Sequence, residues 1–225
     1  MVYILNIETA TKNCSVSLSK NGQTIVINEL AEENFSHAEK LHLFIKDVLA
    51  KAKISLSDLN AIAVSKGPGS YTGLRIGVSA AKGLCYALSV PLLAVDTLAI
   101  LAKQISVDSG IIIPMIDARR MEVFTQTFNA KHEIISLPQN LIVTETSFND
   151  ITDDIHLIGD GALKCKEVLT KTNFFYYSTA LYPSANEMSS LSYKQFCENR
   201  FEDVAYFEPY YLKDFMFTTK NKTLE

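Results

Sequence analysis

The chain of 225 residues has few cysteines, and no two of them are close together. The four are Cys14, Cys85, Cys165 and Cys197, and none forms a C-x-x-C pair. Widely spaced thiols argue against a disulfide framework and against a zinc knuckle. We therefore expect reduced thiols and a cytoplasmic location.

Strong charge of one sign and long apolar runs are also lacking. The 21 Lys and Arg residues nearly balance the 25 Asp and Glu residues, giving a net charge of −4 without a basic run. A protein that binds nucleic acid on its own usually carries a basic patch, so any contact with RNA would require a partner. The N-terminus has no basic leader, and no apolar run is long enough to span a membrane. We expect no association with membranes.

The motifs of nucleotide and acyl-transfer enzymes are incomplete or missing. Segment 65–77 is rich in glycine and lies between an apolar run, 61–64, and a helical pattern that reaches Leu88. A strand, a glycine-rich turn and a helix in this order mark the working end of many α/β sheets. However, Leu and Arg follow Gly73, so the lysine and hydroxyl of a phosphate-binding loop are missing, and Thr72 breaks the pattern G-x-G-x-x-G. A G-x-S-x-G nucleophile elbow is also absent from the sequence.

The helix expected at 70–88 has an unusually wide apolar sector. One face suits packing on a sheet, and beside it lies a second face of mostly small residues. Small side chains allow another helix backbone to approach closely. Two interpretations remain open at this point, a helix of the same chain and a second subunit. The second face consists of Gly73, Gly77, Ala80, Leu84 and Ala87.

The first hundred residues predict a three-stranded meander followed by alternating helices and strands. The expected strands are 2–7, 14–19 and 24–29, with a hairpin turn at Asn21-Gly22. A capping box, Ser36 to Glu39, begins a helix that reaches residue 52. We then expect strands at 61–65 and 92–95 and a helix at 97–105.

The same order of elements returns in the second half. An apolar run at 111–116 ends at Asp117, as the first strand ends at Glu8, an offset of 109 residues. Alternating apolar and polar residues at 122–128 predict the second strand, and a third strand near 133–137 completes a second meander. The remaining expected elements are a strand at 156–159, helices at 163–169 and 184–199, and a polar tail at 218–225.

This repetition indicates an internal duplication. We predict an α/β protein of two ribonuclease H-like domains, residues 1–107 and 108–225, in the arrangement of actin and sugar kinases. In such pairs the acidic residues that end the first strands face the cleft, which would place Glu8 and Asp117 there. The alternative is that both are ordinary polar residues at strand ends.

Five segments of the chain resemble the bacterial TsaB (YeaZ) family. They are residues 7–10, 67–77, 117–120, 159–162 and 209–213. The resemblance spans nearly the whole chain. It implies a non-catalytic scaffold in the synthesis of threonylcarbamoyladenosine on tRNA, docked to the catalytic relative TsaD, with TsaE as an ATPase partner. It also implies a homodimer when the chain is alone, and tRNA contact only through the complex.

The resemblance further implies that the two helices at 36–52 and 70–88 form the partner interface. The candidate interface residues are Leu41, Phe44, Ile45, Val48, Gly73, Ile76, Gly77, Ala80, Leu84 and Ala87. A weaker candidate set for nucleotide or RNA contact is Glu8, Thr9, Arg75, Asp117 and Arg119.

At the positions that match the metal ligands of TsaD, this chain has residues of other types. Where TsaD has two histidines spaced H-x-x-x-H, this chain has Thr97 and Leu101, which are poor ligands. We therefore expect no metal site, no catalytic residues, and no cofactor bound by the isolated chain, with ATP or ADP possible only in the complex. Two alternatives remain, an ATP-dependent phosphotransferase using Glu8 and Asp117, and a stand-alone homodimer.

Overall fold

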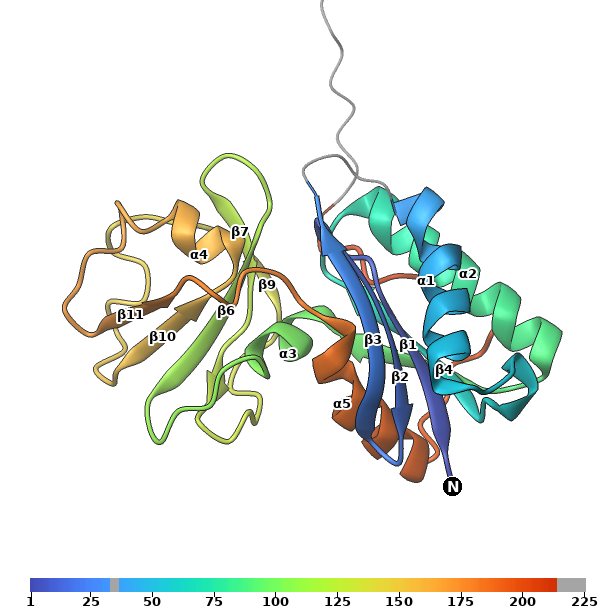
Figure 1. The fold of residues 1–225 in the computed structure, drawn as a ribbon. Helices are drawn as coiled ribbons and strands as arrows, with labels where there is room; N and C mark the ends of the chain where they lie inside the picture. Colours follow the sequence, from blue (N-terminus) through green and yellow to red (C-terminus); the bar gives the residue numbers. More distant parts are fainter. Residues whose placement is uncertain (33–36, 214–225) are drawn as a thin grey trace, which may run out of the picture.

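The computed structural model describes residues 1–32 and 37–213, and it shows two units, each built on its own β-sheet (Figure 1). The first sheet has the order β3-β2-β1-β4-β5. Strands β1 to β3 form an antiparallel meander, and β4 and β5 run parallel to β1. This is the ribonuclease H-like arrangement predicted from the sequence. The strands are β1 (Tyr3–Glu8), β2 (Asn13–Lys20), β3 (Gln23–Ala31), β4 (Ala61–Gly67) and β5 (Leu92–Asp96).

Helices cover both faces of the first sheet. Helices α1 (His37–Ala52) and α2 (Tyr71–Leu88) lie on the outer face, and a short 3-10 helix, η1 (Leu56–Asp58), leads from α1 into β4. Helix α3 (Thr97–Ala102) ends earlier than the predicted residue 105, and α5 (Ala185–Cys197) lies against the opposite face of the sheet. The predicted start of α1 at Ser36 lies outside the described residues.

The second sheet has the order β11-β10-β6-β7-β9, with β8 paired to β6. Strand β6 takes the place that β1 has in the first unit, and β10 lies parallel to it. Its elements are β6 (Ile111–Asp117), β7 (Glu122–Thr125), β8 (Phe128–Asn129), β9 (Gln139–Ile142), β10 (Ile155–Ile158), β11 (Phe174–Tyr177) and α4 (Asp160–Lys164).

Several details of the second unit differ from the sequence prediction. The expected strand at 122–128 is divided into β7 and β8, and β11 was not predicted. The third strand of the meander is β9, whereas residues 133–137 contribute only an isolated bridge between Ile134 and Phe128. Pro138 separates the two segments, and a proline has no N–H to donate to a strand ladder. The predicted helix at 163–169 begins earlier, at Asp160, and ends at Lys164.

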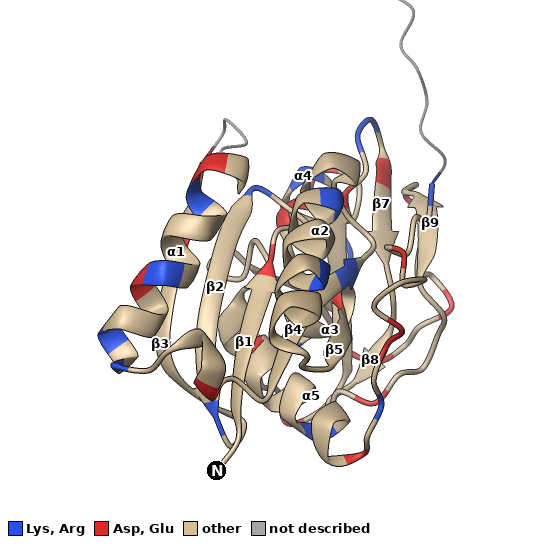
Figure 2. Ribbon diagram, turned by 90° about the vertical axis from the view of Figure 1, so that its right-hand side faces the viewer, with Lys and Arg blue, Asp and Glu red and all other residues tan. Residues whose placement is uncertain are grey.

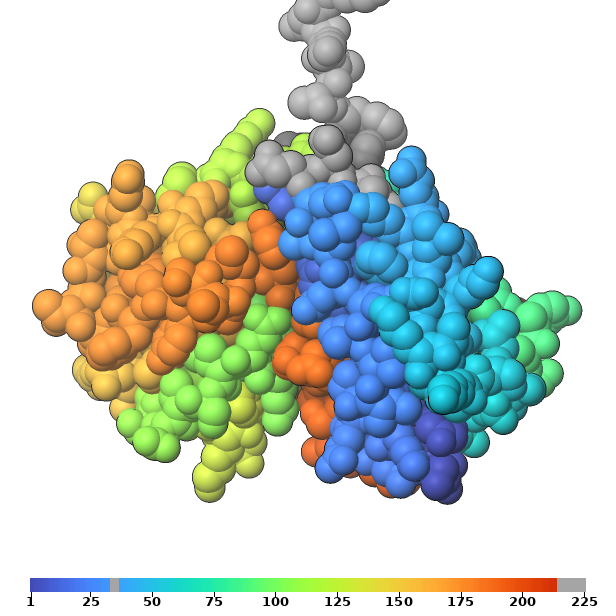
Figure 3. All heavy atoms as spheres, viewed as in Figure 1, coloured from blue at the N-terminus to red at the C-terminus, as the bar shows by residue number. Residues whose placement is uncertain are grey.

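The C-terminal helix α5 returns to the first unit. It begins after the predicted cap, Ser184, whose Oγ accepts a hydrogen bond from Asn186 N at 3.2 Å. Its Ala185 and Met188 pack with Ile4 of β1 in one buried cluster. From the sequence, we expected all of residues 108–225 to belong to the second domain. Helix α5 instead packs on the first unit. In the space-filling view α5 lies beside the edge of β3, where the two units meet (Figure 3).

Strand β2 contacts helices on both faces, by apolar packing on one face and by hydrogen bonds on the other. Its alternation sends Cys14, Val16 and Leu18 into the core beneath α1 and α2. The serines between them face α5 and are hydrogen-bonded: Ser17 Oγ donates to Ala185 O at 2.6 Å. The described part of the chain, 1–32 and 37–213, contains no helix that is both long and apolar enough to cross a membrane.

Candidate partner-binding surface

The glycine-rich segment positions α2 against the loop between β1 and β2. Ser70 N donates to Ala10 O at 2.6 Å, and Thr9 Oγ1 donates to Gly73 O at 2.8 Å. A Cβ added at Gly73 would clash with Thr9 O, and one at Gly77 would clash with Thr9 Oγ1. These glycines therefore permit close contact within the chain. Both are buried in the isolated chain, and their place at a partner interface stays a prediction.

Three of the predicted interface residues on α1 are also internal. Leu41, Ile45 and Val48 are buried in the core of the first unit, because their helical spacing turns them toward the sheet. Phe44 is only partly buried, and Leu43 beside it is 64% exposed. The outer surface of α1 thus offers Phe44, which was predicted, and Leu43, which was not.

The outward face of α2 remains open. Helices α1 and α2 lie side by side on the first sheet, and Arg75 and Lys82 are the only charged residues in α2 (Figure 2). Among the predicted residues of α2, Ile76, Ala80 and Leu84 are half-buried and Ala87 is exposed.

The sequence reasoning did not select Gly83, which lies at the centre of this face. A Cβ added there would meet no described atom within 4 Å. Together with exposed Ser79 and Ala87 and half-buried Ala80, it forms a strip of small residues that we call the outer seam of α2. The signal was present in the sequence, because residues 79, 83 and 87 are each four apart and share one helix face.

Glycine within a helix is unfavourable, and this position has no internal compensation. It costs about 0.5–1 kcal/mol relative to alanine. At Gly77 the contact with Thr9 explains the glycine, whereas at Gly83 no contact in the described chain does. The outer seam therefore leaves open space beside α2 in the described chain.

Glu8 does not line an open cleft, contrary to its predicted position. The side chain is fully buried, and Glu8 Oε1 accepts a hydrogen bond from Ala10 N at 2.5 Å. Glu8 Oε2 has no hydrogen-bond partner among the described residues. Burial raises the pKa of the carboxyl from 4.5 to about 7, although the Ala10 amide opposes the shift.

Asp117, the counterpart of Glu8, is exposed and neutralised by its own unit. Its Oδ1 pairs with Lys164 Nζ at 2.5 Å and accepts from Arg119 N at 2.7 Å. Asp160 Oδ1 accepts from Asp117 N at 3.0 Å, and burial raises the pKa of the Asp160 carboxyl. Glu8 and Asp117 therefore occupy equivalent strand ends in very different environments.

The other weak candidates do not converge with these carboxyls. Thr9 is buried beneath α2. Arg75 places its guanidinium 4.0 Å from the centre of the Tyr71 ring and donates to Tyr211 Oη at 3.2 Å. Arg119 is exposed, in a left-handed backbone conformation with φ +69°.

The two positions that correspond to TsaD histidines have structural contacts. Thr97 is fully buried, and its Oγ1 accepts from Gly67 N at 3.0 Å. Leu101 is fully buried in the core between α3 and the second sheet. Within residues 1–32 and 37–213, no group of three or more His, Cys, Asp or Glu residues is placed to hold a metal ion.

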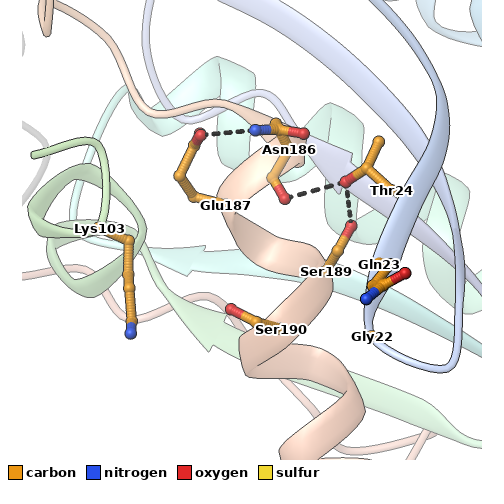
Figure 4. Close-up of a pocket in the computed structure, with 8 residues that line it drawn as sticks. All are labelled: Gly22, Gln23, Thr24, Lys103, Asn186, Glu187, Ser189 and Ser190. Carbon is orange, nitrogen blue, oxygen red and sulfur yellow. Dashed lines mark hydrogen bonds between the residues drawn. The ribbon is translucent and has the colours of Figure 1, made fainter.

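Two shallow hollows lie beside α5, away from Glu8 and Asp117. One, of about 380 Å³, is lined by Lys103, the hairpin residues 22–24 and the first turns of α5 (Figure 4). There Thr24 and Ser189 hydrogen-bond each other at 2.7 Å. The other, of about 520 Å³, includes Glu29 and Glu187. Both are open and polar, and neither has the apolar enclosure that is typical of a small-molecule site.

The fold and this surface define the class of the protein. Two mixed sheets, the first in the order 3-2-1-4-5 with its helical layers, give the duplicated ribonuclease H-like architecture of actin and the sugar kinases. Helices α1 and α2 expose apolar side chains of the first unit, Leu43 on α1 and Tyr86 on α2.

Comparisons with known proteins identify the family. A model described as "TsaD: tRNA N6-adenosine threonylcarbamoyltransferase" matches residues 26–219. The chain is 27% identical over 223 residues to the tRNA threonylcarbamoyladenosine biosynthesis protein TsaB of Escherichia coli, covering 94% of each chain. It is 31% identical over 196 residues to the protein of the same name from Buchnera aphidicola subsp. Schizaphis graminum, covering 82% of this chain and 90% of that one.

A solved structure agrees with these relatives. The crystal structure of YeaZ from Pseudomonas aeruginosa superimposes with a TM-score of 0.82 at 27% identity, covering 94% of this chain and all of that one. The chain therefore belongs to the threonylcarbamoyltransferase-like family described by the model and, within it, to TsaB (YeaZ).

Proposed function

We propose that this chain is a non-catalytic subunit for the synthesis of threonylcarbamoyladenosine on tRNA, and that it docks the catalytic relative TsaD through the outer seam of α2. The observation that carries the proposal is Gly83, an exposed glycine in mid-helix with no described atom near its missing Cβ. Leu43 and Phe44 of α1 extend the apolar surface. The names of the relatives supply the pathway.

A paired-helix interface fits the dimensions of this surface. Stable interfaces bury about 1,600 Å² in total, or about 800 Å² on each partner. Helices α1 and α2 have 16 and 18 residues, and the small side chains of α2 would allow a partner helix to approach closely. Together they can supply this area. Because TsaD shares the fold, it can present equivalent helices, and in its absence a second copy of this chain can occupy the same surface.

The non-catalytic role is supported by how the candidate chemical groups are used. Glu8 is enclosed, Asp117 is paired with Lys164, and Thr97 and Leu101 stand where TsaD has histidines. We therefore assign the transfer reaction to TsaD and ATP hydrolysis to TsaE. A nucleotide and tRNA would bind only to the assembled complex.

Reconstitution of the modification tests this function. TsaD, TsaE, tRNA, ATP and the threonylcarbamoyl donor are combined with or without this chain, and modified adenosine is measured by mass spectrometry. We expect strong stimulation by the chain and no product from the chain without TsaD. An Asp117→Asn variant should stimulate as well as the wild type, because Asp117 has no catalytic part. Equal product without the chain, or product without TsaD, would contradict the proposal.

A further inference from the structure

Residues 201–213 form an extended segment that crosses the first unit beside α2, and we call it the C-terminal strap. Glu202 N donates to Leu92 O at 2.9 Å, which joins the strap to β5. Further along, Tyr210 N donates to Lys66 O at 2.7 Å, which joins it to β4. The strap is thus fixed at Glu202 and at Tyr210 on the unit that carries the outer seam, and its last residue, Lys213, pairs with Glu122 of the second unit at 2.5 Å.

Between these anchors, residues 203–207 make a turn that is held by its own backbone and by α2. Asp203 Oδ1 accepts from Ala205 N at 2.8 Å and from Tyr206 N at 3.1 Å, and Phe207 N donates to Asp203 O at 2.8 Å. Lys82 Nζ donates to Ala205 O at 3.1 Å and to Phe207 O at 3.0 Å. Five hydrogen bonds therefore define the shape of this turn.

The turn presents one aromatic side chain to solvent. Val204 and Phe207 pack against the core of the first unit, whereas Tyr206 between them is 84% exposed. On α2, Tyr86 is 85% exposed and lies one helical turn after Lys82, on the same side of the helix. Since Lys82 reaches the carbonyl groups on both sides of Tyr206, the two tyrosines flank the lysine at neighbouring points of the surface.

Exposed, pre-positioned tyrosines are typical of the residues that dominate binding energy at protein interfaces. A tyrosine buries a large ring and keeps a hydroxyl for the wet rim, and its few rotatable bonds limit the entropy cost. A turn that is already ordered avoids a further ordering cost on binding. The Tyr206 ring is largely exposed in the described chain, so contacts of this ring do not explain why its turn is held by five hydrogen bonds.

We propose that Tyr206 and Tyr86 are anchor residues of the docking surface, and that Lys82 is the positioning residue for Tyr206. This rests on the proposed function, because the occupant is the same catalytic partner that covers the outer seam, which adjoins Tyr86 on α2. The partner would provide an apolar hollow for each ring with a hydrogen-bond acceptor at its rim. The docking surface then extends from α2 onto the C-terminal strap.

Titration calorimetry of the full-length chain with TsaD tests the anchors. We expect Tyr206→Ser and Tyr86→Ser each to weaken Kd about 30-fold, the effect of removing an interface hot spot. Leu137→Ser is the matched control, because Leu137 is 83% exposed but belongs to the second unit, and it should change Kd less than twofold. Unchanged thermal unfolding of each variant shows that folding is intact.

The role of Lys82 has its own readout. Lys82→Met should speed hydrogen exchange at the amides of Ala205, Tyr206 and Phe207 and weaken Kd, while exchange in the second sheet stays the same. Faster exchange with unchanged Kd would overturn the positioning role.

The two levels of the proposal can fail separately. If Gly83→Arg abolishes association but both tyrosine variants bind within twofold of wild type, the anchor inference is wrong and the proposed function stands. If the tyrosine variants impair only self-association of this chain, the assigned occupant is wrong. If Gly83→Arg itself binds TsaD normally, the proposed docking surface fails.

Discussion

The side chain of Thr9 occupies the space that a Cβ on Gly77 would need. Through this contact and the hydrogen bond from Thr9 Oγ1 to Gly73 O, the loop after β1 covers one side of α2. Another side of the helix, centred on Gly83, is left open. Two glycines of one helix thus have different surroundings: Gly77 contacts Thr9, and Gly83 has no described atom beside it.

This difference predicts opposite effects of the same substitution. Gly77→Ala should destabilise the isolated chain by about 1–3 kcal/mol, because overpacking forces the Thr9 loop away. Gly83→Ala should stabilise it by about 0.5–1 kcal/mol, since alanine restricts the unfolded chain and fits the helix. Urea unfolding of both variants measures the two changes. Destabilisation by both would show that Gly83 also has an internal role.

The buried carboxyl of Glu8 predicts a dependence of stability on pH. Its pKa rises from 4.5 in the unfolded chain to about 7 in the folded one, so the folded state binds the proton more tightly. Stability is therefore lost as pH rises from about 4.5 to 7, by about 3 kcal/mol.

Glu8→Gln removes this titration while keeping the acceptor for Ala10 N. Chemical unfolding at pH 5 and pH 8 should show the variant gaining about 3 kcal/mol relative to wild type at the higher pH. Other groups titrate equally in both proteins and cancel in the comparison. A difference between the two proteins that does not change with pH would contradict the assignment.

Asn6 connects β1 to α5 through buried hydroxyl groups, and its loss should be costly. Asn6 Oδ1 accepts from Ser192 Oγ at 2.7 Å, and its Nδ2 donates to Ser17 Oγ at 3.1 Å. Asn6→Ala should destabilise the chain by about 2–3 kcal/mol, because buried hydroxyls would lose their partners. Asn149→Ala, at an exposed site, should stay within about 0.5 kcal/mol. Similar losses for both, measured by thermal unfolding, would refute the role of the network.

The pairing of Asp117 with Lys164 predicts weak nucleotide binding by the isolated chain. Lys164 compensates the charge of Asp117, and Glu8 is enclosed, so the two carboxyls are not arranged to hold a metal-bound triphosphate. Calorimetry with ATP and magnesium should show no binding at micromolar concentrations. Micromolar affinity would instead favour a phosphotransferase.

The sequence predicted the first unit well because its signals are local. The alternation of β2 and the apolar stripe of α1 set strand and helix, and the turn at Asn21-Gly22 sets the hairpin. The internal contacts of Gly73 and Gly77 could not be predicted, for a physical reason. Thr9 lies 64 residues before Gly73, and periodicity does not show which distant loop will cover a small face.

The second unit and α5 were harder to predict. Pro138 ended an expected strand, and the remaining elements are short, with weak periodicity. Helix α5 crosses to the first sheet partly through polar contacts. The serines of β2 and α5 resemble surface residues in sequence, yet Ser17 and Ser192 are fully buried and hydrogen-bonded. Hydrophobic patterning does not reveal such a contact.

The affinity of the Gly83→Arg variant for TsaD tests the central claim most directly. An arginine on the outer seam would separate the two helix backbones without touching the core, because space around the missing Cβ is open. We predict an unchanged melting temperature and at least a hundredfold weaker Kd by calorimetry. Wild-type affinity in a fully folded variant would contradict docking through α2.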